Sequence, residues 1–154
     1  MNTSNASSHK LLPPILLLLV VAAMGLTHVV LPRPSVLPAA YRWSGLVPLA
    51  LGIAVAVAAR AQFARAATEI NTFAEPTRLV TGGLFRLSRN PMYLGMGLAA
   101  AGAAMLSGTA AAFLLAAAFV VVVDRWYIAF EERRMRARFG VLYEAYARST
   151  RRWF

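Results

Sequence analysis

The residues best suited to chemistry lie in two short polar segments, 86–93 and 124–132. Two apolar stretches run between these segments and are joined by Ser107-Gly108-Thr109, a combination typical of a tight turn. So short a turn forces the two stretches into an antiparallel hairpin, so the polar segments at its open end must lie side by side. We therefore expect one cluster, on the cytosolic side of a membrane, that contains Arg89, Asn90, Tyr93, Arg125, Glu131 and Glu132.

The first polar segment leads into a helix start. A glycine-bearing turn at 81–83 comes first, and Pro91 then suits a first helical position because its missing N–H would have had no partner there. The residue before a proline is disfavoured in helical geometry, so we expect Asn90 to be extended or to cap the helix. Polar side chains beside a helix N-terminus favour an anionic or zwitterionic ligand.

Composition indicates a membrane protein. Of 154 residues, 59% are hydrophobic, and the mean hydropathy is +0.59. The net charge of +10 does not indicate nucleic-acid binding, because the arginines lie between apolar stretches rather than on a soluble domain. There is no cysteine, and the two histidines, His9 and His28, lack the spacing of a zinc site, so no metal is expected.

The chain is predicted to be one all-α integral membrane domain, 1–154. Its four expected transmembrane helices cover 11–31, 44–60, 92–106 and 110–127. The arginines cluster after the second and fourth of them, so the positive-inside rule places both termini in the cytosol, and we expect a bacterial inner membrane. The polar stretch 62–77 is interpreted as a helix end at the interface followed by a loop.

Two helical features are expected to organise the second half. In the third apolar stretch, the pairs Gly95/Ala99 and Gly97/Ala101 allow a neighbouring helix to approach closely. After the fourth, the charged sequence is predicted to form one cytosolic amphipathic helix. Its apolar face would carry Met135, Phe139, Leu142 and Tyr146.

The second half, 77–152, resembles the integral-membrane methyltransferases, namely the isoprenylcysteine carboxyl methyltransferase and phospholipid N-methyltransferase families. The resemblance rests on three motifs in order: Leu79-Val80-Thr81-x-Gly83-Leu84-Phe85, then Arg89-Asn90-Pro91-x-Tyr93-x-Gly95, then Glu131-Glu132 followed by Phe139-Gly140-x-x-Tyr143-x-x-Tyr146. It implies a catalytic half that binds S-adenosyl-L-methionine without a Rossmann fold. The sequence agrees, since it has no strand–GxGxxG–helix unit.

The resemblance also implies roles for individual residues. The cofactor-binding candidates are Leu79, Val80, Phe85, Asn90, Pro91, Met92, Tyr93, Glu131 and Glu132, and the catalytic candidates are Arg89, Asn90 and Arg125. Glu131 would receive the cofactor's ammonium group, and Arg125 would contact the substrate. The prenylcysteine enzymes usually have histidine at the position of Asn90 and an aromatic hydroxyl at that of Phe85. Asparagine cannot shuttle a proton near neutral pH, which argues against assuming a prenylcysteine substrate.

The expected function is methyl transfer to a lipophilic or small acceptor, with membrane lipids as partners. The acceptor stays open among lipid amines, prenylated thioether acids, thiols and quinone-like molecules, as does the oligomeric state. A non-catalytic lipid-binding protein of the same fold is the first alternative. A small-molecule transporter is a second alternative. It would need an intramembrane carboxylate to couple transport to protons, and the first three apolar stretches have none. A reductase is a further alternative, because sterol reductases resemble these enzymes in their C-terminal part. They are much larger, and this chain is short for holding both a nicotinamide cofactor and a sterol.

Overall fold

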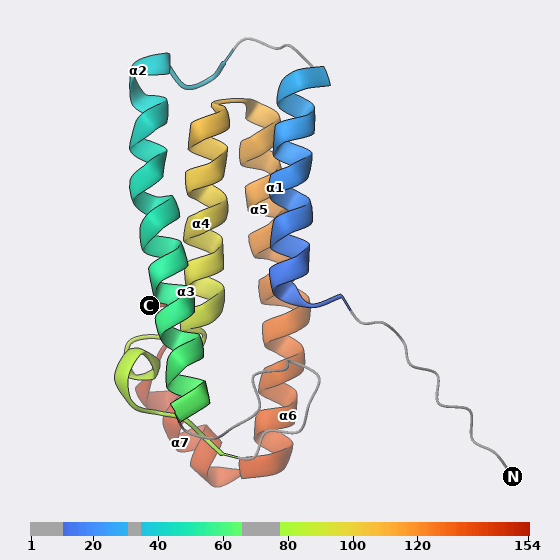
Figure 1. Ribbon diagram of the computed structural model, residues 1–154. Coiled ribbons are helices and arrows are strands. Elements are labelled where there is room, and N and C mark those ends of the chain that lie inside the picture. The colour runs from blue at the N-terminus through green and yellow to red at the C-terminus, as the bar shows by residue number, and fades with distance from the viewer. Residues whose placement is uncertain (1–10, 31–34, 66–77) are drawn as a thin grey trace, which may run out of the picture.

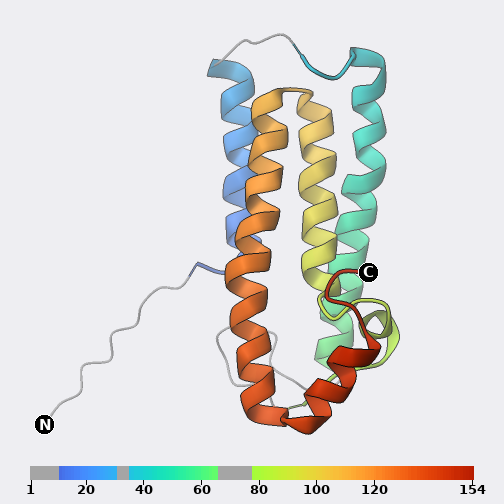
Figure 2. The same cartoon turned by 180° about the vertical axis from the view of Figure 1, so that it is seen from behind.

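The computed structural model describes residues 11–30, 35–65 and 78–154, and every regular element in these ranges is helical. Four long helices lie side by side as a bundle (Figures 1 and 2). They are α1 (Pro13–Val30), α3 (Leu46–Arg65), α4 (Pro91–Ser107) and α5 (Ala110–Val122). The short elements α2 (Ala39–Arg42) and η1 (Trp43–Gly45) lead into α3, and the 3-10 turn η2 (Gly83–Arg86) precedes α4.

The make-up of the bundle is that of a helical membrane protein. Three continuous helical segments are long and apolar enough to cross a membrane: Pro13–Val30, Ala39–Arg65 and Ala110–Phe139. Helix α4 is apolar but has only 17 residues. A fourth crossing and the side on which the termini lie therefore stay predictions. The predicted interfacial loop falls mainly on 66–77, outside the described residues, as do Lys10 and Arg33.

Helices α3 and α4 approach each other closely through glycines, as the sequence predicted for the Gly95/Ala99 pair. A β-carbon on Gly95 would lie 2.5 Å from the carbonyl oxygen of Gly52 on α3, so only glycine fits there. A β-carbon on Gly97 would instead meet Val120 on α5 at an ordinary 3.5 Å. Close approach therefore continues from Gly95 to Gly102, one face of α4, and not along the Gly97/Ala101 pair.

The turn between α4 and α5 is as tight as its sequence predicts. Gly108 adopts a left-handed conformation with φ 70° and ends α4, where its N–H donates to the carbonyl of Ala104 at 2.9 Å. The Thr109 hydroxyl accepts the N–H of Ala112 at 3.3 Å and so caps the start of α5. The left-handed Gly108 and the Thr109 cap together define the hairpin that carries the two polar segments.

The single amphipathic C-terminal helix predicted from the sequence is wrong. Helix α5 continues through a π-helical turn, η3 (Val123–Ile128), into α6 (Ala129–Phe139), and α7 (Val141–Ser149) then folds back beneath the bundle (Figure 1). Gly140 breaks the helix because it adopts a φ of +48°, which favours glycine. The break separates the expected apolar face: Tyr146 is buried, whereas Leu142 is 68% exposed.

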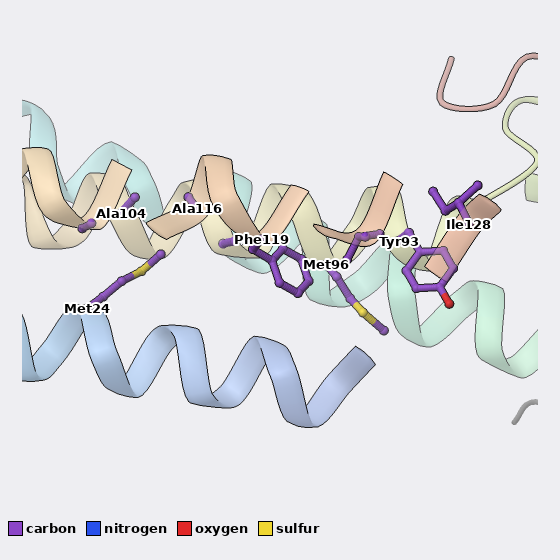
Figure 3. Packing of buried hydrophobic residues seen from close by; sticks show 10 residues of the cluster. Met24, Tyr93, Met96, Ala104, Ala116, Phe119 and Ile128 are labelled. Carbon is purple, nitrogen blue, oxygen red and sulfur yellow. The ribbon is translucent and has the colours of Figure 1, made fainter. Parts of the chain in front are cut away.

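Two apolar clusters hold these helices together. The first joins α1, α4 and α5, and it ends near Tyr93 and Ile128 (Figure 3). The second packs the turn before α4 against α3, α6 and α7. Its buried members are Ala59, Phe85, Tyr143 and Tyr146, and its partly buried members include Phe63, Leu79, Val80, Leu84, Met92, Met135, Phe139 and Ala147. The start of α4 thus lies between the two clusters.

Candidate functional site

A hydrogen bond joins the two ends of the hairpin. The hydroxyl of Tyr93, in the first turn of α4, donates to Glu131 Oε1 on α6 at 2.6 Å. The Tyr93 ring is 5% exposed and fixed in the first apolar cluster, whereas Glu131 is partly exposed. A rigid phenol therefore orients a carboxylate that lies at the edge of the protein interior.

The neighbouring carboxylate, Glu132, is surrounded by arginines. Its Oε1 accepts from Arg89 at 3.0 Å and from Arg152 Nε at 3.1 Å, and its Oε2 accepts from Arg152 at 2.7 Å. Arg136, one helical turn further on, lies 3.6 Å from Oε2. The Glu132 side chain is only 5% exposed. This group is buried, and its charge is balanced by side chains from three parts of the chain.

The arginines keep Glu132 ionised. Burial on its own would raise the pKa of the Glu132 carboxyl, but the hydrogen bonds and charges of Arg152 and Arg89 hold that pKa below its usual value. An ionised carboxylate that is hydrogen-bonded on both oxygens is a stable anchor. We therefore regard Glu132 as a fixed negative charge around which the surrounding segments are arranged.

Arg89 ties the start of α4 to the end of α7. Besides its bond to Glu132, its terminal nitrogen Nη1 donates to the carbonyls of Ala147 at 2.6 Å and Thr150 at 3.0 Å. Its Nε is buried and has no hydrogen-bond partner among the described residues. The backbone N–H of Arg89 also donates to the carbonyl of Arg151 at 2.9 Å.

Asn90 occupies the N-cap position of α4, as the sequence allows, but its side chain makes no capping bond. Its amide nitrogen donates instead to the carbonyl of Arg152 at 3.0 Å, and the Ser88 hydroxyl donates to the same carbonyl at 3.2 Å. Asn90 is 8% exposed. The C-terminal segment therefore takes up the amide that would otherwise cap the helix.

The apolar residues assigned to the cofactor by resemblance gather in the second cluster. Phe85 is buried, and its ring packs edge-on against Phe63 at a centroid distance of 4.7 Å. The Tyr146 hydroxyl donates to the Phe85 carbonyl at 2.6 Å, and Gln62 on α3 accepts the N–H of Leu84 at 3.2 Å. These bonds hold the turn before α4 in place, with Leu79, Val80 and Met92 beside it.

The expected juxtaposition is thus present for most of the predicted residues. Arg89 and Tyr93 reach Glu132 and Glu131, and Pro91 begins α4 as predicted. Arg125 is not brought into the cluster: its side chain is 83% exposed, and its ion pair is with the adjacent Asp124 at 3.5 Å. It lies on the outer side of the π-helical turn, so the expectation that it lies near Glu131 is wrong.

Two residues of this arrangement, Arg152 and Gln62, were missed by sequence reasoning. Arg152 contacts both Glu132 and Asp124, and Gln62 holds the turn at 83–86. Arg152 is one of many arginines near the C-terminus, and no local spacing distinguishes it from its neighbours. In the ranges that the structure describes, no group of three or more His, Asp or Glu side chains is placed to hold a metal ion.

Comparison with known proteins identifies the family. The model of the phospholipid methyltransferase family matches residues 40–141, more than half of the chain. The matched region contains the α4–α5 hairpin, Tyr93, Glu131 and Glu132, and it ends before Arg152. No curated protein and no solved structure matches the sequence. The chain therefore belongs to the phospholipid methyltransferase family of integral-membrane methyltransferases, whose activity is methyl transfer to lipid-type substrates.

Proposed function

We propose that this protein transfers a methyl group from S-adenosyl-L-methionine to the amine of a lipid headgroup at the cytosolic face of the membrane. The observation that carries the proposal is the 2.6 Å bond from Tyr93 to Glu131. It holds a partly exposed carboxylate at the mouth of the hairpin, next to the first turn of α4. That is where a zwitterionic donor needs a negative group.

The residues present fit such a cofactor. Its amino-acid end carries an ammonium and a carboxylate. A carboxylate has about four lone-pair sites, so Glu131 can bind an ammonium while it accepts from Tyr93. The N-terminus of α4 supplies the positive end of a helix dipole for the cofactor's carboxylate, and the cap residue Asn90 directs its side chain elsewhere. The second cluster, with Leu79, Val80 and Phe85, offers an apolar surface for the remainder.

When bound, S-adenosylmethionine supplies a methyl group on a positively charged sulfur. The task of the protein is to align the acceptor with that group and to exclude water, because an in-line displacement depends on geometry. Tyr93 fixes the direction of Glu131, and Glu131 would hold the ammonium end of the donor. Arg89 and Glu132 keep the start of α4 against α6 and α7, and we assign Arg89 to this positioning because both of its terminal nitrogens are engaged.

The state of Asn90 favours a lipid amine over a prenylcysteine acid as the acceptor. The buried Asn90 amide is bonded to a backbone carbonyl, and it stands where the prenylcysteine enzymes usually have histidine. A residue so engaged cannot take part in proton transfer. In an amine acceptor the nitrogen lone pair forms the new N–C bond as the S–C bond breaks, and the proton then leaves to water.

The charge distribution supports the cytosolic face. Exposed arginines gather at the end of the bundle that carries α6 and α7, namely Arg133, Arg138, Arg148 and Arg151. The opposite end, at α2 and the turn between α4 and α5, has Arg42 among the described residues. Under the positive-inside rule, this asymmetry supports a cytosolic location for the end with α6 and α7.

The test uses the full chain reconstituted in vesicles with methyl-labelled S-adenosylmethionine. One set of vesicles contains a lipid with a primary-amine headgroup, and the other contains only the fully methylated choline headgroup. We expect labelled lipid in the first set alone, with the label lost in Glu131→Gln. Glu144→Gln is the matched control, because Glu144 is a partly exposed carboxylate on α7 paired with Arg136. Absence of both labelling and saturable donor binding by the wild-type protein would refute the proposal.

A further inference from the structure

The last residues of the chain join three segments of the site. Arg152 donates to both oxygens of Glu132 on α6, at 3.1 and 2.7 Å, and lies 3.4 Å from Asp124 in the π-helical turn. Its backbone carbonyl accepts from Ser88 at 3.2 Å and from Asn90 at 3.0 Å. One residue thus connects the turn before α4 to the helix that follows α5.

Its neighbours reinforce the connection. The Arg151 carbonyl accepts the N–H of Arg89 at 2.9 Å, and the Trp153 indole N–H donates to Asp124 at 2.9 Å. The Trp153 side chain also packs on the first apolar cluster, which contains Tyr93. The segment runs upward from α7 along the bundle and ends beside it (Figure 2).

We propose that Arg152 is a positioning residue for the site and that residues 151–153 act as a clasp that holds Tyr93 and Glu131 in register. The inference rests on the proposed function. Arg152 holds Glu132 through two hydrogen bonds. Because Glu131 and Glu132 are adjacent on α6, a displacement of Glu132 would also move Glu131. The same arginine, through its carbonyl, fixes Asn90, three residues before Tyr93. Arg152 therefore helps to fix the positions of both Tyr93 and Glu131.

The clasp lies beyond the part of the chain that matches the family, which ends at residue 141. Its contacts are formed by the side chain of Arg152 and by the backbone of 151–152. The side chain of Arg151, in contrast, is exposed and has no hydrogen bond or ion pair described. Arg151→Gln therefore removes the same charge one position away while it leaves the backbone contacts in place.

The experiment compares Arg152→Gln, Arg152→Lys and Arg151→Gln with the wild-type protein in micelles, well below the melting temperature of each. Calorimetry gives the affinity for S-adenosylmethionine, and hydrogen exchange without the donor gives the protection of the Arg89 and Asn90 amides. We expect Arg152→Gln to weaken binding about tenfold or more, since charged hydrogen bonds are lost. Both amides should exchange faster in the same variant.

Arg152→Lys keeps the charge but cannot hold both Glu132 oxygens and Asp124 at once, so its affinity should fall between the wild-type and Gln values. Arg151→Gln should match the wild type in both measurements. If Arg152→Gln does not fold, the affinity of Arg152→Lys for S-adenosylmethionine tests the proposal on its own. Wild-type affinity in every folded Arg152 variant, even with a lowered melting temperature, would overturn the inference. No donor binding by the wild-type chain would overturn the proposed function itself, and the positioning role with it.

Discussion

Glu131 and Glu132 are adjacent in sequence, yet the structure predicts opposite consequences when each loses its charge. Glu131 is partly exposed and accepts from a neutral phenol, whereas Glu132 is buried among arginines. We expect Glu131→Gln to impair cofactor binding with little loss of stability. Glu132→Gln should instead destabilise the fold.

The magnitudes follow from the contacts. Breaking a buried ion pair costs about 3–5 kcal/mol, because the remaining charge is left uncompensated. Arg89 is 12% exposed in its side chain, and glutamine still offers one acceptor, so about 3 kcal/mol is expected for Glu132→Gln. For a chain of this size that corresponds to roughly 6–12 °C in the melting midpoint. Glu131→Gln keeps an acceptor for Tyr93 at a partly exposed position, so its loss of stability should be smaller than that of Glu132→Gln.

The loss of cofactor affinity in Glu131→Gln is set by one charged hydrogen bond. Such a bond contributes about 1.5–3 kcal/mol, which corresponds to roughly 10- to 140-fold in the dissociation constant. Thermal unfolding in micelles measures the stability, and calorimetry with S-adenosylmethionine measures the affinity. Glu144→Gln serves as the control for both. A stable Glu132→Gln with weakened binding, together with an unstable Glu131→Gln that binds normally, would refute the assignment.

Three further predictions follow from the same contacts. Tyr93→Phe should weaken cofactor binding less than Glu131→Gln does, because it loses the orienting bond but keeps the carboxylate; calorimetry checks this. The pKa of Glu132 is lowered in the folded protein, so its stabilising effect is present above the usual carboxyl pKa of about 4 and is lost as pH falls through its folded value. The melting midpoint should therefore fall on acidification, and less so in Glu132→Gln. Gly95→Leu should separate α3 from α4 and destabilise the protein by more than about 2 kcal/mol, measured by thermal unfolding, whereas Gly97→Ala should be tolerated.

Much of the site could be predicted because it depends on short-range chemistry. Gly108 and Thr109 are typical turn and cap residues. Because the turn is short, the start of α4 and the end of α5 must lie side by side. Pro91 marks the start of α4 because proline is accepted there and not further into a helix. From these positions the contact between Tyr93 and Glu131 follows, although they are 38 residues apart.

The parts that could not be predicted depend on long-range choices. Gly140 permits a break but does not require one, and the packing of Tyr143 and Tyr146 with Phe85, which the sequence does not reveal, accompanies the turn there. Which arginine pairs with Glu132 is likewise undetermined locally, because several at the C-terminus have the same chemistry. Arg152 is selected because its backbone is already held by Ser88 and Asn90.

The π-helical turn explains why one arginine can reach two acidic residues that an ordinary helix would separate. An α-helix turns about 100° per residue, so Asp124 and Glu132, eight residues apart, would differ by about 80° around the axis. A turn with i→i+5 bonds accommodates about one more residue, which brings the two to within about 20° of one face. Both then contact Arg152, while Arg125 is left on the outer side. The irregular turn and the C-terminal clasp are therefore one arrangement: the turn aligns the carboxylates, and Arg152 joins them to the start of α4.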